Sequence, residues 1–164
     1  MDLYCPVSYT HLAEKGEDHI VQSLFSAGVG SGHHRMMALS SAIKRGLYVM
    51  IKIILDSSSL LDDVSDGESM AVLQQACVTK LQMPDDVCLS FVTLFQSMIN
   101  TPDDVNHNIP LHFSVRAGNV GMVQALLEQG ADTESSNNEG LTPLHMAATK
   151  GHLEIVQLLL DHGA

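Results

Sequence analysis

The sequence predicts an all-α fold built from repeated helix-turn-helix units. Two observations lead to this prediction: a composition suited to packed helices, and a pattern that recurs after 33 residues. Hydrophobic residues make up 45% of the 164 residues, whereas aromatic residues make up only 4% and Trp is absent. A core of Leu, Ile, Val, Ala and Met favours helices over a sheet, in which β-branched and aromatic side chains are preferred.

The repeated pattern is clearest in the last third of the chain. The tetrapeptide Ile109-Pro110-Leu111-His112 returns 33 residues later as Thr142-Pro143-Leu144-His145. The same spacing relates four further pairs: Gly118 and Gly151, Val123 and Val156, Gly130 and Gly163, and Ala131 and Ala164. Because the register holds across a whole unit, the period indicates a repeat architecture.

Local signals predict where the helices of the last unit begin and end. Thr142 can cap the first helix, and Pro143 fits its first turn, where a missing N–H costs nothing. Gly151 accepts the left-handed conformation that ends a helix. Two buried faces are expected: a small-residue face of the first helix at Leu144, Ala147 and Ala148, and an apolar face of the second at Leu153, Val156, Leu159 and Leu160.

From Gly140 onward, the segment GLTPLHMAATKGHLEIVQLLLDHGA resembles the ankyrin repeat almost position for position. The resemblance implies a solenoid of stacked helix-turn-helix units joined by short β-hairpins. It also implies that the rings of His112 and His145 are structural hydrogen-bonding groups. Ile109 stands where the later unit has Thr142, so His112 lacks the Thr partner that is available to His145.

Weaker forms of the pattern extend toward the N-terminus. Leu39, Ala42 and Gly46 match Leu144, Ala147 and Gly151, and Leu73 and Ala76 repeat the start of a unit. Pro84 opens a helix after a longer turn. We expect five repeats, at residues 1–32, 33–66, 67–104, 105–137 and 138–164, of which the first three are degenerate.

Both ends of the chain depart from the repeat. Residues 6–12, PVSYTHL, read as one frame of a transposon end used in preparing sequencing libraries, so residues 1–12 are expected to be artefactual. A natural, imperfect first helix is the alternative. At the other end, Ala164 falls inside a unit and leaves an apolar flank without a polar cap. We therefore expect a fragment of a longer protein.

Charge and cysteine content restrict the classes of function. The chain has 8 Lys and Arg against 19 Asp and Glu, a net charge of −11, which disfavours nucleic-acid binding. The basic residues from His33 to Lys52 precede an acidic stretch from Ile53 to Asp104, a pattern that fits either a solvated face or a surface that orients a partner. Three cysteines without a CxxC pair, no signal peptide and no membrane span predict a cytoplasmic protein, with the nucleus as an alternative.

No motif for catalysis or for cofactor or metal binding emerges from the sequence. The acidic segment 62–68 fails the EF-hand template, because Val64 and Leu73 fall on ligand positions, and we read it as a solvated hairpin. The adjacent His33 and His34 point in different directions and are not expected to share a metal. We therefore expect no enzyme activity, no cofactor and no metal.

The resemblance implies protein binding through a concave face made of loop tips and exposed first-helix positions. Of these, Phe113 and Arg116 are favoured, because aromatic and Arg side chains dominate binding hot spots. The expected partner-binding residues are Phe113, Arg116, Met146, Thr149, Lys150, Asn137, Asn138 and Glu139, with Ala117, Ser136, Ser41, Lys44 and Arg45 at related positions. We expect a monomeric array with an unidentified protein partner. The alternatives are a targeting or autoinhibitory segment of a larger enzyme, channel or ubiquitin-ligase adaptor.

Overall fold

The computed structural model describes residues 32–56, 64–79 and 83–164. The chain divides into two compact units, Met1–Val72 and Leu73–Ala164, with the boundary inside one helix. The tract PVSYTHL and all of the predicted first repeat except Gly32 lie outside the described residues.

The first unit contains two complete helices and the start of a third. Helix α3 (Gly32–Arg45) packs against α4 (Tyr48–Leu55), and Gly46 separates them with a φ of 69°. Positive φ is strained for residues with a Cβ, which explains why glycine stands at this sharp turn. Leu39 and Ala42, which match core positions of the last unit, are buried. Ile51, Ile54 and Leu55 of α4 are buried as well, whereas Tyr48 is half-buried.

Helix α5 (Asp66–Val78) begins inside the acidic segment that we expected to form a hairpin. That expectation was wrong for its last residues, because Ser65 and Glu68 form a capping box. The Ser65 N–H donates to Glu68 Oε2 at 3.3 Å, and the Glu68 N–H donates to Ser65 Oγ at 3.3 Å. The carboxylates of Asp66 and Glu68 also suit the positive end of the helix dipole.

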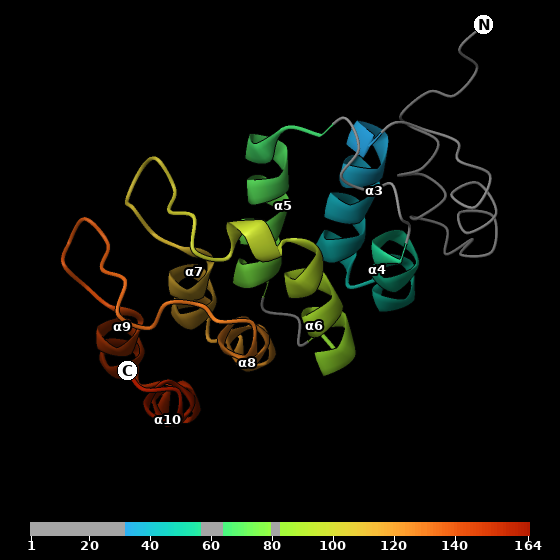
Figure 1. Ribbon diagram of the computed structural model, residues 1–164. Helices are drawn as coiled ribbons and strands as arrows, with labels where there is room; N and C mark the ends of the chain where they lie inside the picture. Colours follow the sequence, from blue (N-terminus) through green and yellow to red (C-terminus); the bar gives the residue numbers. More distant parts are fainter. Residues whose placement is uncertain (1–31, 57–63, 80–82) are drawn as a thin grey trace, which may run out of the picture. The chain divides into compact units, whose positions relative to one another are not determined.

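The second unit holds the end of α5 and five further α-helices, within the part of the chain that the structure describes. These are α6 (Asp85–Leu94), α7 (Pro110–Ala117), α8 (Val120–Glu128), α9 (Pro143–Lys150) and α10 (Leu153–Asp161), with a short 3-10 helix η1 (Gln96–Met98) after α6. Helix α7 packs against α8 and α9 against α10, and the pairs lie side by side through α7 with α9 and α8 with α10 (Figure 1). The predicted all-α architecture of stacked helix pairs is thereby confirmed.

The helix ends of the last pair form as the sequence predicts. Thr142 Oγ1 accepts a hydrogen bond from the His145 N–H at 3.4 Å, and Pro143 is the first residue of α9. Gly151 ends α9 with a φ of 71°. In α7, Ile109 provides no side-chain cap, and its N–H instead donates to His112 Nδ1 at 3.3 Å. Of these two helices, α9 has the Thr–His partnership and α7 does not.

The loops between helix pairs differ from the short β-hairpins that the resemblance implied. No strand is assigned in the described residues; the loop after α8 is closed by turns. The Asn137 N–H donates to the Leu141 carbonyl at 3.1 Å, and the Gly140 N–H donates to the Asn137 carbonyl at 2.9 Å. A strand ladder needs successive backbone pairs, whereas here Asn137 Oδ1 takes two further N–H groups, from Glu139 and Leu141.

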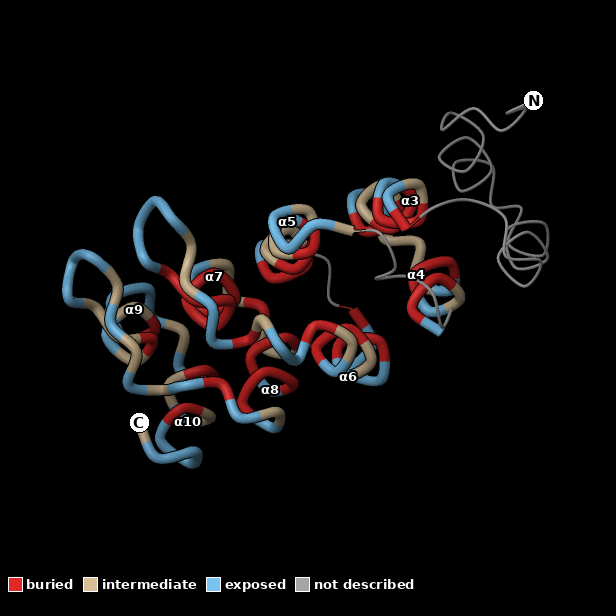
Figure 2. Tube along the Cα trace, turned by 45° about the horizontal axis from the view of Figure 1, so that its top comes forward, coloured by how far each residue is buried: buried red, intermediate tan, exposed pale blue. Residues whose placement is uncertain are grey.

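Burial in the last pair departs from the prediction. Leu159 is buried, but Leu153 is 81% exposed, Leu160 is 49% exposed, and Leu144 is only half-buried. Among the described residues, α9 and α10 are covered by α7 and α8 on one side only, and Figure 2 shows more exposed residues on α9 and α10 than on α7 and α8. Two of the four apolar side chains predicted for the buried face of α10, Leu153 and Leu160, are therefore not covered by another helix among the described residues.

Candidate functional site

A cleft of about 270 Å³ opens between α7, α9 and the two loops that precede them. We call it the α7–α9 cleft; it is lined by Asn106, Asn108, Arg116, Asn137, Glu139, Leu141, Met146, Thr149 and Lys150. Six of the eight side chains expected to bind a partner line this one cleft. The other two, Asn138 and Phe113, do not line it.

Hydrogen bonds between the loops hold the cleft's wall. Asn137 Nδ2 donates to Asn108 Oδ1 at 3.2 Å, and Asn138 Nδ2 donates to the Val105 carbonyl at 3.2 Å. Asp103 Oδ1 in turn accepts the N–H groups of Asn106 and Asn108 at 2.9 and 3.0 Å. The amides of Asn137 and Asn138 thus shape the site, because their polar atoms are used within it.

The expectation that Phe113 is an exposed contact residue was wrong. Its side chain is only 8% exposed, because α7 is covered by neighbours that the sequence position alone does not reveal. The Arg116 guanidinium carbon lies 5.0 Å from the centroid of the Phe113 ring, a cation–π contact. Phe113 therefore positions the exposed Arg116 rather than presenting its own ring to a partner.

The His112 ring ties the two repeats together beneath the cleft. Nδ1 accepts from Ile109, so the neutral ring carries its proton on Nε2 and donates it to the Leu141 carbonyl at 3.1 Å. Burial of the ring holds the pKa of His112 below its ordinary value. The structural role implied for this histidine is thereby confirmed. The ring of His145, by comparison, is exposed and bonds only within its own helix start, to Thr142 Oγ1 at 2.9 Å.

The charge of the α7–α9 cleft contrasts with that of its surroundings. Arg116 and Lys150 are the only Lys or Arg residues between positions 81 and 164, and both line the cleft. The same stretch contains ten carboxylates, of which Glu139 alone lines the cleft. No ion pair joins Arg116 or Lys150 to a carboxylate in the residues that the structure describes. The site is therefore a small cationic cleft in an acidic segment.

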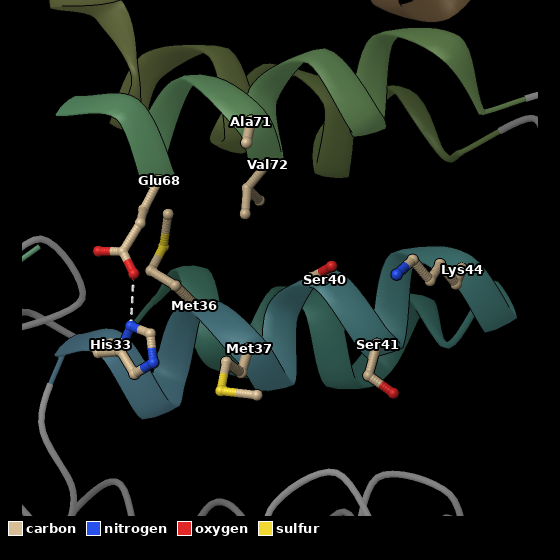
Figure 3. A pocket seen from close by; sticks show the side chains of 9 residues that line it. All are labelled: His33, Met36, Met37, Ser40, Ser41, Lys44, Glu68, Ala71 and Val72. Carbon is tan, nitrogen blue, oxygen red and sulfur yellow. Dashed lines mark hydrogen bonds and ion pairs between the residues drawn. The ribbon is translucent and has the colours of Figure 1, made fainter. Parts of the chain in front are cut away.

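The first unit contains a second depression, which we call the α3–α5 groove. It has a volume of about 380 Å³ and is lined by His33, Met36, Met37, Ser40, Ser41, Lys44, Glu68, Ala71 and Val72. His33 Nδ1 lies 2.5 Å from Glu68 Oε1 at one end, with Lys44 at the other and Met36 between the helices (Figure 3). Hydrogen bonds from the Ser65 N–H and from His33 hold the pKa of Glu68 below its ordinary value.

Only part of the α3–α5 groove was predicted from the sequence. Ser41 and Lys44 line it as expected for exposed first-helix positions, whereas Arg45 does not. The pairing of His33 with Glu68 was missed, since it joins residues 35 positions apart. The sequence did offer one signal, the Ser65-x-x-Glu68 spacing of a capping box, which would have placed Glu68 in the first turn of a helix.

Other reactive groups lie away from both sites. Cys77 and Cys88 are free and buried, and burial raises the pKa of each thiol to about 12. Such thiols stay protonated and unreactive at neutral pH. Within the described ranges, no cluster of three His, Cys, Asp or Glu side chains is placed to hold a metal ion, and no helix is long and apolar enough to cross a membrane.

Comparison with known proteins finds relatives for about a third of the chain. The chain is 38% identical over 55 residues to the ankyrin repeat and LEM domain-containing protein 2 homolog of Caenorhabditis elegans. This match covers 34% of the chain and 9% of that protein. The chain is also 43% identical over 53 residues to the putative palmitoyltransferase ZDHHC13 of Danio rerio, and 40% identical over 52 residues to palmitoyltransferase ZDHHC13 of Homo sapiens. Each of these matches covers 32% of this chain and 8% of the relative, so the chain spans less than a tenth of these proteins.

The family comparison matches the region that contains the α7–α9 cleft. Residues 86–164 match the model for ankyrin repeats in three copies. This match covers α7 to α10 and nearly all of α6, and ankyrin repeats are generally protein-binding modules. The helix pairs, the Pro-Leu-His helix starts and the glycine-ended helices agree with it. This part of the chain therefore belongs to the ankyrin repeat family.

Proposed function

We propose that this chain is a non-catalytic protein-interaction module that binds a segment of a partner polypeptide in the α7–α9 cleft. One observation carries the proposal: Arg116, Asn137, Glu139, Met146, Thr149 and Lys150, selected by their repeat positions, converge on one cleft. The site combines half-buried apolar surface at Leu141 and Met146 with exposed polar groups. Binding sites commonly join an apolar floor to a few placed polar groups.

The hydrogen bonds that hold the cleft's loops together also support the proposal. Its loops are joined by side-chain hydrogen bonds from Asn137 and Asn138, and His112 links α7 to the loop before α9. A preformed site loses less conformational entropy on binding than a flexible one, so more of the contact energy contributes to affinity. A short extended or turn-like partner segment fits the size of the cleft better than a flat protein surface.

The proposal is tested by blocking the cleft with one bulky side chain. Thr149→Trp should abolish selection of peptides from a random dodecapeptide display library panned on the full chain. Gln157→Trp is the matched control, because Gln157 is exposed on α10, away from the cleft. Like Thr149, Gln157 makes one side-chain hydrogen bond within its own helix. If both variants retain the peptides selected by the parent, the cleft is not the binding site.

A second candidate function follows from the relatives. Two of them are named as palmitoyltransferases and one as a LEM domain-containing protein, and the matches cover only 8–9% of their lengths. An ankyrin segment of a larger protein can bring a binding partner to a domain elsewhere in that protein. Under this alternative, the α7–α9 cleft recruits a partner to the larger protein or targets that protein to its partner. The full-length transcript of this chain would then reveal an attached domain.

We propose the cytoplasm as the compartment, with the nucleus as the alternative. The cysteine pattern supports this proposal, because buried, unpaired thiols such as Cys77 and Cys88 are typical of reducing compartments. Imaging of the full-length protein, fused to a fluorescent protein at its C-terminus, would test it. Secretion into the medium would contradict the proposal.

A further inference from the structure

We propose that the α7–α9 cleft selects an acidic side chain, so that the partner segment places an Asp or Glu carboxylate between Arg116 and Lys150. This inference rests on the proposed function and gives the partner a specific chemistry. The only two Lys or Arg side chains in residues 81–164 come from different helices, α7 and α9, and line the same cleft.

The two cations are available for a ligand. Both side chains are exposed, and neither is paired with a carboxylate in the described part of the chain. The Arg116 guanidinium carbon lies 5.0 Å from the centroid of the Phe113 ring, and a cation–π contact of this kind does not use the guanidinium N–H groups as hydrogen-bond donors. A carboxylate accepts such N–H groups in a bidentate geometry, whereas a lysine ammonium adds a point charge.

The other polar groups of the cleft are largely committed to the fold. Asn137 uses its amide for Asn108 and for two backbone N–H groups, and the Thr149 hydroxyl donates to the His145 carbonyl at 2.8 Å. A ligand therefore meets few uncommitted donors besides Arg116 and Lys150. Leu141 and Met146 offer apolar contact next to them, which favours an apolar residue near the acidic one in the partner.

The surroundings favour an acidic peptide over a nucleic acid. Ten carboxylates in residues 81–164 repel a polyanion, whose charges extend far beyond one cleft. A single carboxylate on a short segment contacts the two cations without approaching most of those acids. Glu139 lines the same cleft and disfavours a second negative charge beside the first. The expected motif is thus one acidic residue flanked by uncharged or apolar residues.

Selection from a random dodecapeptide display library provides the test. Peptides enriched on the full parent chain should share an Asp or Glu at one fixed motif position. Replacing that residue by Asn or Gln should weaken binding by up to about fivefold for each cation it contacts, the upper end of what an exposed ion pair contributes. Arg116→Gln and Lys150→Gln should each cause a loss of the same size, and raised salt should weaken binding of the parent.

Lys52→Gln is the matched control for net charge. Lys52 is exposed on α4, outside the α7–α9 cleft, and its replacement removes one positive charge from the chain. It should leave the affinity for the selected peptides unchanged. A charge exchange completes the design: Lys150→Glu should reject the acidic peptide and bind the corresponding Lys peptide better than the parent does.

The outcomes separate this inference from the proposed function. The enriched peptides could fail to bind Thr149→Trp and yet share no acidic residue. This result would overturn the acidic specificity and leave the proposed binding in the cleft intact. Enrichment that Thr149→Trp does not affect would overturn both. Equal losses for Lys52→Gln and Lys150→Gln would show a general charge effect and also overturn the inference.

Discussion

The helix pairs α7–α8 and α9–α10 share a sequence register but differ in burial. Leu111 is fully buried, whereas Leu144, 33 residues later, is half-buried; Leu127 is 6% exposed, whereas Leu160 is 49% exposed. The first pair is covered on two sides, by α6 and by the second pair, and the second pair is covered on one. The same residues therefore contribute differently to stability, because hydrophobic stabilisation scales with the apolar area removed from water.

The largest expected effect comes from paired leucine truncations. Leu111→Ala should lower the free energy of unfolding by about 2–5 kcal/mol, because it leaves a cavity in a fully covered position. Leu144→Ala should cost on the order of 1 kcal/mol, since a half-exposed side chain loses less burial. Urea unfolding monitored by circular dichroism measures both. Equal losses would mean that position in the repeat, rather than cover by neighbours, determines the contribution.

The second comparison uses the glycines that end α7 and α9. Both have positive φ, 75° at Gly118 and 71° at Gly151, so alanine at either should cost about 1 kcal/mol or more through backbone strain. A Cβ on Gly118 would also lie 3.0 Å from the His152 ring, whereas a Cβ on Gly151 meets nothing within 4 Å. Gly118→Ala should therefore be the more destabilising of the two in thermal melting. The reverse order would show that the His152 ring moves aside without cost.

The third comparison concerns the buried His112. Its pKa is lowered in the folded state, so the unfolded chain takes up a proton at higher pH than the folded one does. The associated stability is present above the ordinary histidine pKa of about 6.5 and is lost as the pH falls below it. The parent's melting temperature should fall from pH 7.5 to pH 5.5. His112→Gln should lower the melting temperature at pH 7.5 and show a weaker pH dependence.

The exposed His145 provides the control for this measurement. His145→Gln leaves the ring of His112 and its hydrogen bond to the Leu141 carbonyl in place. Its melting temperature should therefore keep the parent's pH dependence. If His112→Gln and the parent show the same slope, the buried ring is not the group that titrates.

The smallest effect is expected at the uncovered face of α10. Leu153 is 81% exposed, and Leu153→Gln should change the free energy of unfolding by no more than about 0.5 kcal/mol. Leu127→Gln should be far more disruptive, because it places an amide among buried apolar side chains. Comparable stability of the two variants would show that the burial difference between α8 and α10 has no energetic consequence.

The candidate site was predictable in part because repeat position indicates which side chains share a face. Arg116, Met146, Thr149 and Lys150 were named from their register, and they do line one cleft. Phe113 has an equally favourable register and is buried, because the cover over α7 comes from elsewhere in the chain. The α3–α5 groove was only partly found, since the His33–Glu68 contact joins two helices whose approach no local pattern specifies.

The sequence by itself determined the helix pairs, their period and their ends. These features depend on local chemistry: a capping Thr142, a proline in a first turn, and glycines where φ must be positive. The tertiary structure alone decided which apolar faces are covered, that Phe113 supports Arg116, and that two cations from different helices meet in one cleft. The physical reason is that burial and charge pairing depend on what packs against a helix, whereas the helix itself is encoded by its own residues and their nearest neighbours.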